Sequence, residues 1–168
     1  MISKLIDSPI CQGLAEREAA AIFEIAHPVS VKSGMVLFRE GDSADGLFVL
    51  IEGELEIVAE SSDKQRHVLA RISPGGVVGE MSLLDRSTRR SATAVALTDG
   101  RLLRLPADRF AQLLESDSVA ALKMVHNVAR VLAYRLQRMN EQVLSGVDKR
   151  RQADELVEFQ RILNRWSF

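Results

Sequence analysis

The sequence has little of what marks a secreted, membrane-spanning or nucleic-acid-binding protein. Its 168 residues include one cysteine, Cys11, which excludes an internal disulfide and fits a reducing compartment. Its apolar runs are far shorter than the roughly 18 residues that a membrane-spanning helix needs, and charge interrupts the first residues too early for a signal peptide. The net charge of −1 does not indicate a generally basic nucleic-acid-binding protein. We therefore expect a soluble cytoplasmic protein.

Groups that could carry out chemistry are few and scattered. The histidines His27, His67 and His126 lie far apart, and none falls with a partner at the spacing of metal ligands. Cys11 has no evident base that would activate it as a nucleophile. The glycines at 75–79 do not form the G-x-G-x-x-G motif of a dinucleotide fold. We expect no catalytic residue, no metal site and no cofactor, so the protein is not expected to be an enzyme.

The middle of the chain is rich in glycine and in short alternating patterns. Eight of the ten glycines lie between Gly34 and Gly100, and residues 47–51 are apolar on both faces, as in a buried strand. Apolar and polar residues alternate at Val29 and Val31, Val36 and Phe38, Leu55 and Ile57, and Val68 and Ile72. Turn pairs occur at Ser33-Gly34, Glu52-Gly53 and Asp99-Gly100, and the last is a strong hairpin signal. Many short strands with regular turns predict a β-sandwich or barrel.

Helices are predicted on both sides of this region. Residues 1–26 read as helical, and a short helix is expected at residues 107–115, directly after Pro106. The longest helical pattern covers residues 119–144, and Asp117 or Ser118 can cap its start. Gly146 is expected to end that helix, after which Asp148 would cap a last helix at residues 149–166.

Apolar residues on the long helix follow a heptad spacing. They recur in steps of 3 and 4, at Leu122, Val125, Ala129, Leu132, Leu136, Met139 and Val143. Three heptads of this kind favour a coiled-coil seam between two copies of the chain. The alternative is a helix packed on its own β-rich domain, for which Met124, Val128 and Val131 offer a second apolar strip. The two arrangements are compatible with each other.

The stretch at 75–94 has the residue types that suit a small anionic ligand. Gly79 lets the backbone approach a ligand closely, and residues 80–84 can form a short helix whose first N–H groups face an oxyanion. Arg90 can make a bidentate contact to a phosphate, and Ser91 adds a hydroxyl and an N–H. The carboxylate of Glu80 would be repelled by that phosphate and needs a neutral donor, such as a sugar hydroxyl.

These residues resemble the phosphate-binding segment of cyclic nucleotide-binding domains. The matching motifs are Gly79-Glu80-Met81 and, about ten residues later, Arg90-Ser91-Ala92-Thr93. An upstream signature also matches, at Gly41-Asp42, Gly46, Leu47-Phe48-Val49-Leu50 and Gly53. The family includes sensor domains of bacterial catabolite activators and of protein kinase A regulatory subunits. The resemblance covers roughly residues 1–145 and implies a mainly β fold, an eight-stranded double-stranded β-helix of jelly-roll type, with an N-terminal helical segment and long C-terminal helices.

The resemblance also implies a role for each site residue. Glu80 would accept a hydrogen bond from the ribose 2′-hydroxyl, Gly79 and Met81 would offer backbone groups, and Arg90 and Ser91 would hold the cyclic phosphate. The purine pocket would be lined by Val78, Leu69 and Ala70. The long helix would cap the base with Arg135 and Asn140. Met139 replaces a threonine of bacterial relatives, which leaves the base preference open, with cyclic AMP favoured over cyclic GMP.

Bacterial regulators of this family continue into a DNA-binding winged helix-turn-helix. Only 22 residues follow Gly146, too few for such a unit, so direct DNA binding is not expected. We expect a stand-alone cyclic nucleotide sensor, with the binding domain at 1–145 and an additional helix at 146–168 that is either an output element toward a protein effector or a static brace. Two alternatives stay open: an interaction module that binds no nucleotide, and a cyclic dinucleotide sensor with extra charge from Arg86, Arg89 and Arg90.

Overall fold

The computed structural model describes residues 7–60, 64–85 and 87–165, and the side chains of 142, 143 and 145–165 lie outside what it describes. The chain divides into two compact units, residues 1–129 and 130–168. The predicted N-terminal helical segment is present in the first unit as two separate elements, the short 3-10 helix η1 (Pro9–Cys11) and the helix α2 (Glu16–Glu24). The residues between them are not helical, and residues 1–6 of that prediction lie outside the described residues. The predicted boundary between a binding domain and an additional helix at residue 145 stays a prediction.

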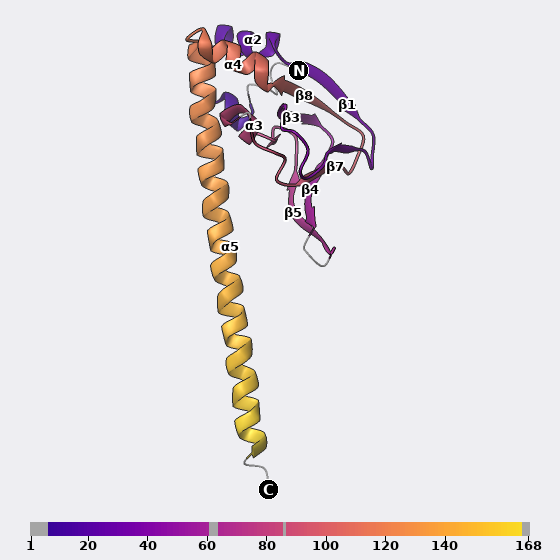
Figure 1. The fold of residues 1–168 in the computed structure, drawn as a ribbon, viewed down its shortest axis with the longest axis vertical. Coiled ribbons are helices and arrows are strands. Elements are labelled where there is room, and N and C mark those ends of the chain that lie inside the picture. Colours follow the sequence, from indigo (N-terminus) through magenta and orange to yellow (C-terminus); the bar gives the residue numbers. More distant parts are fainter. Residues whose placement is uncertain (1–6, 61–63, 86, 166–168) are drawn as a thin grey trace. The chain divides into compact units, whose positions relative to one another are not determined.

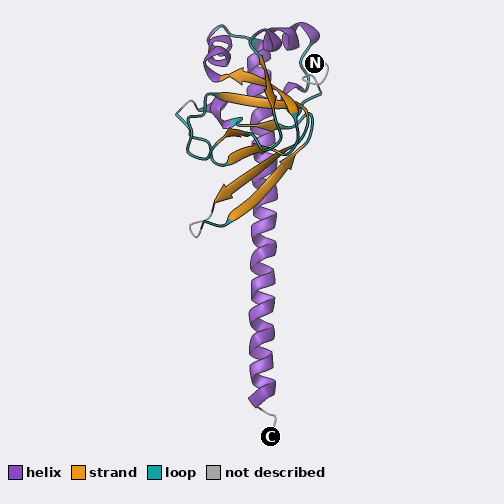
Figure 2. Cartoon of the chain, turned by 90° about the vertical axis from the view of Figure 1, so that its right-hand side faces the viewer, coloured by secondary structure: helices purple, strands orange, loops and turns teal. Residues whose placement is uncertain are grey.

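Within the described residues, eight strands form two antiparallel sheets, as the mainly β prediction requires (Figure 2). One sheet has the order β1-β8-β3-β6, built from β1 (His27–Val31), β8 (Gly100–Pro106), β3 (Gly46–Glu52) and β6 (Val77–Val78). The other has the order β2-β7-β4-β5, built from β2 (Val36–Phe38), β7 (Thr93–Ala96), β4 (Leu55–Glu60) and β5 (Arg66–Ile72). The strands predicted from alternation and the buried strand predicted at 47–51 are all present.

The predicted hairpin at Asp99-Gly100 is wrong. Strands β7 and β8 on either side of it belong to different sheets, and so do the strands that flank the other two turn pairs. Instead of pairing with each other, β7 pairs with β2 and β4, and β8 pairs with β1 and β3. The carboxylate of Asp99 binds another turn, where it accepts hydrogen bonds from the backbone N–H of Ser33 at 2.9 Å and from Lys32 Nζ at 2.7 Å. The three turns therefore connect the two sheets at one end of the roll, which is how a jelly-roll closes.

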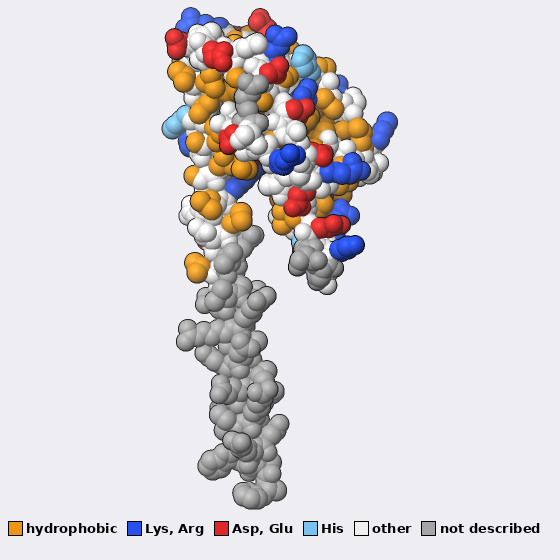
Figure 3. All heavy atoms as spheres, in the orientation of Figure 1, with side chains coloured by type: hydrophobic (Ala, Val, Ile, Leu, Met, Phe, Trp, Pro, Cys, Tyr) orange, Lys and Arg blue, Asp and Glu red, His pale blue; other side chains and the backbone are white. Residues whose placement is uncertain are grey.

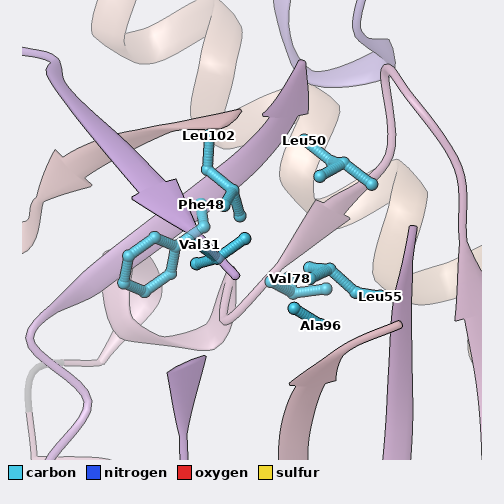
Figure 4. Packing of buried hydrophobic residues seen from close by; sticks show 7 residues of the cluster. All are labelled: Val31, Phe48, Leu50, Leu55, Val78, Ala96 and Leu102. Atoms are coloured by element: carbon cyan, nitrogen blue, oxygen red, sulfur yellow. The ribbon is translucent and has the colours of Figure 1, made fainter. Parts of the chain in front are cut away.

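Buried apolar residues from the two sheets pack together in a cluster, drawn in Figure 4. Its members come from both sheets: Val31, Phe48, Leu50, Leu55, Val78, Ala96 and Leu102. Each larger side chain contributes roughly 1.5–3 kcal/mol by leaving water. Partly buried Phe38 and Ile57 pack against this cluster.

Helix α4 (Ala107–Glu115) follows β8 as predicted, and α5 (Val119–Arg165) completes the chain. Within the first unit, Met124 and Val128 on α5 are fully buried. Nearby, Asn127 Nδ2 donates to the carbonyls of Ile10 and Gln12, at 3.1 and 2.8 Å. Two residues of the second apolar strip, Met124 and Val128, thus pack on the chain's own domain. The third residue, Val131, lies in the second unit.

Helix α5 is continuous through Gly146, so the predicted break at that residue and a separate helix capped by Asp148 are wrong (Figure 1). A glycine inside a helix lowers helix stability by about 1 kcal/mol relative to alanine. The cooperative hydrogen bonds of a long helix offset this loss. Glycine typically ends a helix at the position where the backbone adopts a left-handed conformation with positive φ. Gly146 is not among the residues with positive φ.

Candidate functional site

The loop after β6 turns sharply into a one-turn helix. Gly79 has φ of 75°, a left-handed conformation that glycine adopts without strain, and α3 (Met81–Leu84) begins two residues later. The carbonyl of Gly79 accepts hydrogen bonds from Ser82 Oγ at 2.8 Å and from the backbone N–H of Ser82 at 3.3 Å. These bonds place the buried carboxyl-bearing residue Glu80 at the start of α3, where the sequence predicted it.

Arg90 is the buried cation of this region, with only 5% of its surface exposed. Its Nη2 lies 3.0 Å from Asp45 Oδ1, and its Nη1 donates to the carbonyl of Gly79 at 3.5 Å. The guanidinium also lies over two rings, with Cζ 4.3 Å from the centroid of Phe38 and 5.6 Å from that of Phe48. Burial lowers the pKa of Arg90, and the neighbouring charge of Asp45 acts in the opposite direction.

One hydrogen-bond donor of the Arg90 guanidinium has no acceptor among the described residues. Arg90 Nε is buried and has no hydrogen-bond partner among the residues that the structure describes. A buried N–H without a partner costs about 1–3 kcal/mol, and more on a charged group. An anionic ligand that supplies an acceptor removes this cost, so the arrangement is suited to a phosphate.

Two distant sequence motifs meet at Arg90. The backbone N–H of Arg90 donates to the carbonyl of Asp42 at 2.9 Å, and the N–H of Gly41 donates to the carbonyl of Arg90 at 2.8 Å. Asp42 closes its own turn by accepting a hydrogen bond from the N–H of Arg39 at 2.8 Å. The Gly41-Asp42 motif and the Arg90-Ser91 motif are therefore two sides of one site.

Asp45 and Arg104 were not identified from the sequence as site residues. Asp45 Oδ2 lies 2.6 Å from Arg104 Nη2, while the other oxygen binds Arg90. Asp45 stands beside Gly46 in the upstream signature, which is the signal that could have revealed it. Arg104 comes from β8, and only the register of the sheet brings it here.

The structure brings together part of the predicted ligand set. Gly79, Glu80, Met81, Arg90 and Ser91 lie in one segment, with Ser91 and Met81 exposed and Arg90 and Glu80 buried. Val78 packs in the core cluster instead of standing free on a surface.

The other predicted ligand residues come from β5 and α5. Leu69, 57% exposed, is an extra residue in β5 between Val68, which pairs with Val58, and Ala70, which pairs with Ile57. Such a bulge re-aims side chains and is common next to binding sites. Arg135 and Asn140 lie on α5 in the second unit, so their contact with a ligand stays a prediction.

The described residues offer no other obvious chemistry. Within them, no group of three or more His, Cys, Asp or Glu side chains is placed to hold a metal ion. In the same part of the chain, no helix is both long and apolar enough to cross a membrane. On the face drawn in Figure 3, basic and acidic side chains are interspersed over the first unit.

Comparison with known proteins agrees with this site. The family model described as Cyclic nucleotide-binding domain matches residues 28–117. The Cyclic AMP receptor protein of Thermus thermophilus is 33% identical over 130 residues, which make up 77% of this chain; the chain spans 58% of that relative's length.

Solved structures give the same result. The N-terminal domain of a transcriptional regulator from Streptomyces coelicolor A3(2) has a TM-score of 0.70 and 31% identity, covering 81% of this chain and 94% of that chain. The c-di-GMP responsive global regulator CLP of Xanthomonas campestris has a TM-score of 0.67 and 26% identity, covering 76% and 62%. The matched segment contains every site residue from Gly41 to Arg104. This chain therefore belongs to the cyclic nucleotide-binding domain family.

Proposed function

We propose that this chain is a sensor that binds cyclic AMP or cyclic GMP and relays the signal to a partner protein through its C-terminal helix. The observation that carries the proposal is the buried Arg90, oriented by Asp45 and by two aromatic rings, with one donor unpartnered among the described residues. A buried arginine with spare hydrogen-bonding capacity next to a glycine loop suits a phosphate ligand.

In the proposed complex each group has one task. Arg90 and Ser91 bind the cyclic phosphate, and the backbone around Gly79 and Met81 closes on it. Glu80 accepts a hydrogen bond from the ribose 2′-hydroxyl, because an ionised carboxylate can only accept. Leu69 and Ala70 contact the base, and Arg135 and Asn140 cap it. The bound nucleotide is released unchanged, since we propose a binding domain and not an enzyme.

Cyclic AMP is the proposed ligand, supported by the name of the Thermus relative. The match to a c-di-GMP responsive regulator supports a cyclic dinucleotide as the second candidate. Such a ligand carries two phosphates, and the exposed Arg89, next to Arg90, could bind the second one. Arg86, the third arginine of that prediction, lies outside the described residues.

We further propose that the protein is a homodimer through the seam on α5. Leu122, Leu136 and Met139 are exposed by 56%, 59% and 60%, which is a large cost for apolar side chains unless a second copy covers them. Val125, Ala129 and Leu132 complete the seam, whereas the side chain of Val143 is not described. The relay would use α5 because its first turns are bound to the N-terminal segment, with Lys123 Nζ 2.7 Å from Glu18 Oε2.

Isothermal titration calorimetry with cyclic AMP, cyclic GMP and cyclic di-GMP tests the proposal. We expect the tightest binding for cyclic AMP, at a stoichiometry of one nucleotide per chain. Chromatography of the nucleotide after incubation should recover it unchanged. Tightest binding of cyclic di-GMP would favour the second candidate, and no binding of any of the three would leave the interaction module.

A further inference from the structure

Arg104 is a charged residue on the inner face of a sheet. In β8 it stands two residues from Leu102, which belongs to the core cluster, so both side chains point to the same face. Its partner across the pair with β3 is Phe48, another member of that cluster. An arginine at such a position is rare, because a cation near an apolar core needs a specific partner.

That partner is Asp45, which Arg104 shares with Arg90. The two carboxylate oxygens are divided: Oδ2 lies 2.6 Å from Arg104 Nη2, and Oδ1 lies 3.0 Å from Arg90 Nη2. The backbone of Asp45 is fixed as well, since its carbonyl accepts a hydrogen bond from the N–H of Ala107 at 3.0 Å. The carboxylate therefore stands between two guanidinium groups at a defined place.

The charge of the Asp45 carboxylate is thus shared between the guanidinium groups of Arg90 and Arg104. A carboxylate paired with Arg90 alone would direct its full charge to that guanidinium and compete with an incoming phosphate. A second cation on the other oxygen takes part of that charge and holds the carboxylate in one orientation. Arg90 then keeps hydrogen-bonding capacity for an anion, in agreement with its unpartnered Nε.

We propose that Arg104 is a positioning residue of the phosphate site, which acts through Asp45 to orient Arg90 and to keep it available to the ligand. The inference rests on the proposed function, because it assumes that Arg90 binds the phosphate. It differs from a structural role of the ion pair, in which Arg104 would neutralise Asp45 for folding alone. Burial is the main cause that lowers the pKa of Arg90, and the nearby positive charge of Arg104 lowers it further.

The chain offers a closely matched control for the substitution Arg104→Gln. Arg101 lies on the same strand and forms an ion pair with Glu52, with Nε 2.9 Å from Oε2. Arg101→Gln removes the same charge and also breaks a pair with a carboxylate, yet neither Arg101 nor Glu52 contacts Arg90 in any described interaction. Arg101→Gln therefore reports the effect of losing one positive charge and one carboxylate pair from β8 while the pairing of Asp45 is kept.

The test is a double-mutant cycle on cyclic AMP affinity, measured by calorimetry on the full chain. We expect Arg104→Gln to weaken binding about tenfold and Arg101→Gln to change it by less than about twofold. In an Asp45→Asn background, Arg104→Gln should have no further effect, because the carboxylate through which it acts is gone. Equal effects of the two arginine variants, or additive losses from Asp45→Asn and Arg104→Gln, would overturn the proposal. If Arg104→Gln fails to fold, Arg104→Lys replaces it, with a smaller loss expected because the charge is kept.

A second measurement works without nucleotide. The Nε–H signal of Arg90 in the nitrogen–proton correlation spectrum of the free protein can be assigned by its loss in Arg90→Lys. We expect Arg104→Gln to shift this signal and Arg101→Gln to leave it in place; an unchanged signal in Arg104→Gln would overturn the positioning role. If the wild type binds none of the three nucleotides, the proposed function fails, and this spectrum still decides whether Arg104 orients Arg90.

Discussion

The backbone of Gly79 and the guanidinium of Arg90 are packed so closely that no side chain fits between them. The Gly79 carbonyl lies 3.5 Å from Arg90 Nη1, and a Cβ on Gly79 would overlap that same nitrogen. Gly79 also has φ of 75°. Two separate constraints, conformation and space, therefore require glycine at this position, and both serve the placement of the arginine.

We predict that Gly79→Ala weakens cyclic nucleotide binding by at least about tenfold and also destabilises the fold. The left-handed conformation costs an alanine roughly 1–2 kcal/mol, and the added Cβ displaces the Arg90 guanidinium. Gly75→Ala is the matched control, because Gly75 has φ of 89° but no atom within 4 Å of an added Cβ. Urea unfolding of both variants measures the cost of backbone strain, and calorimetry measures the effect of displacing the Arg90 guanidinium on nucleotide affinity. Equal affinity of the two variants would contradict the prediction.

For Arg90→Leu we expect most nucleotide affinity to be lost while the domain stays folded. Losing a charge-assisted bidentate contact costs roughly 2–4 kcal/mol, which is about 30- to 1000-fold in affinity. Arg89→Leu is the control: this neighbour is exposed and donates to the carbonyl of Gly41 at 3.0 Å, so it should change binding far less. Wild-type affinity in a folded Arg90→Leu protein would make Arg89 the next candidate.

Much of the fold was predictable because its signals are local. Alternating apolar residues such as Val29 and Val31 indicate a strand with one buried face. The buried strand at 47–51 can be predicted because all five of its residues are apolar. The glycine and arginine motifs of the phosphate segment were recognisable too, since they depend on backbone conformation and charge within a few residues. These predictions concern what each segment does by itself.

The missed features depend on contacts between distant segments. Asp99-Gly100 has the composition of a hairpin turn, but Asp99 binds the turn at Ser33, 66 residues away, and the strands separate into two sheets. Arg104 reaches Asp45 across 59 residues only because β8 pairs with β3 in one register. Side-chain partners of this kind cannot be read from local pattern, so the phosphate site was predicted without the residues that orient it.

The proposed dimer gives a prediction about α5. Leu132→Asp combined with Leu136→Asp should yield monomers, because carboxylates in an apolar seam are costly to bury. Tyr134→Asp is the control, since this residue is 62% exposed on the same helix but lies off the heptad positions. Light scattering at micromolar concentration measures the mass. A monomeric wild type, or a monomeric Tyr134→Asp variant, would contradict the seam.

The continuity of α5 through Gly146 can be tested with one substitution. Alanine is favoured over glycine inside a helix by about 1 kcal/mol, so Gly146→Ala should raise helix content and thermal stability of α5. At a helix end, where glycine takes a left-handed conformation, the same change would lower both. Circular dichroism during heating gives the sign. Hydrogen exchange on residues 149–165, with and without nucleotide, then shows whether this part responds to the ligand or is a static brace.

Cys11 provides a test of how tightly the N-terminal segment is held on the domain. It is 1% exposed, and burial raises its pKa from 9.0 to about 12. The folded state therefore keeps the thiol proton at a pH where the unfolded chain has lost it. The resulting stabilisation is fully present well below pH 9 and is lost as the pH rises through 9 toward 12.

We expect the free energy of unfolding in urea to fall between about pH 8 and about pH 10, with about 1.4 kcal/mol of the fall due to Cys11. The Cys11→Ala variant lacks this contribution. The difference in free energy of unfolding between wild type and variant should therefore be smaller at pH 10 than at pH 8 by about 1.4 kcal/mol, because all other titrating groups are the same in both proteins. As an independent check, a thiol reagent added near pH 8 should label the native protein slowly and the unfolded protein quickly. Rapid labelling of the native protein would mean that the segment of Pro9–Cys11 opens readily, and the pH-dependent difference would then be absent.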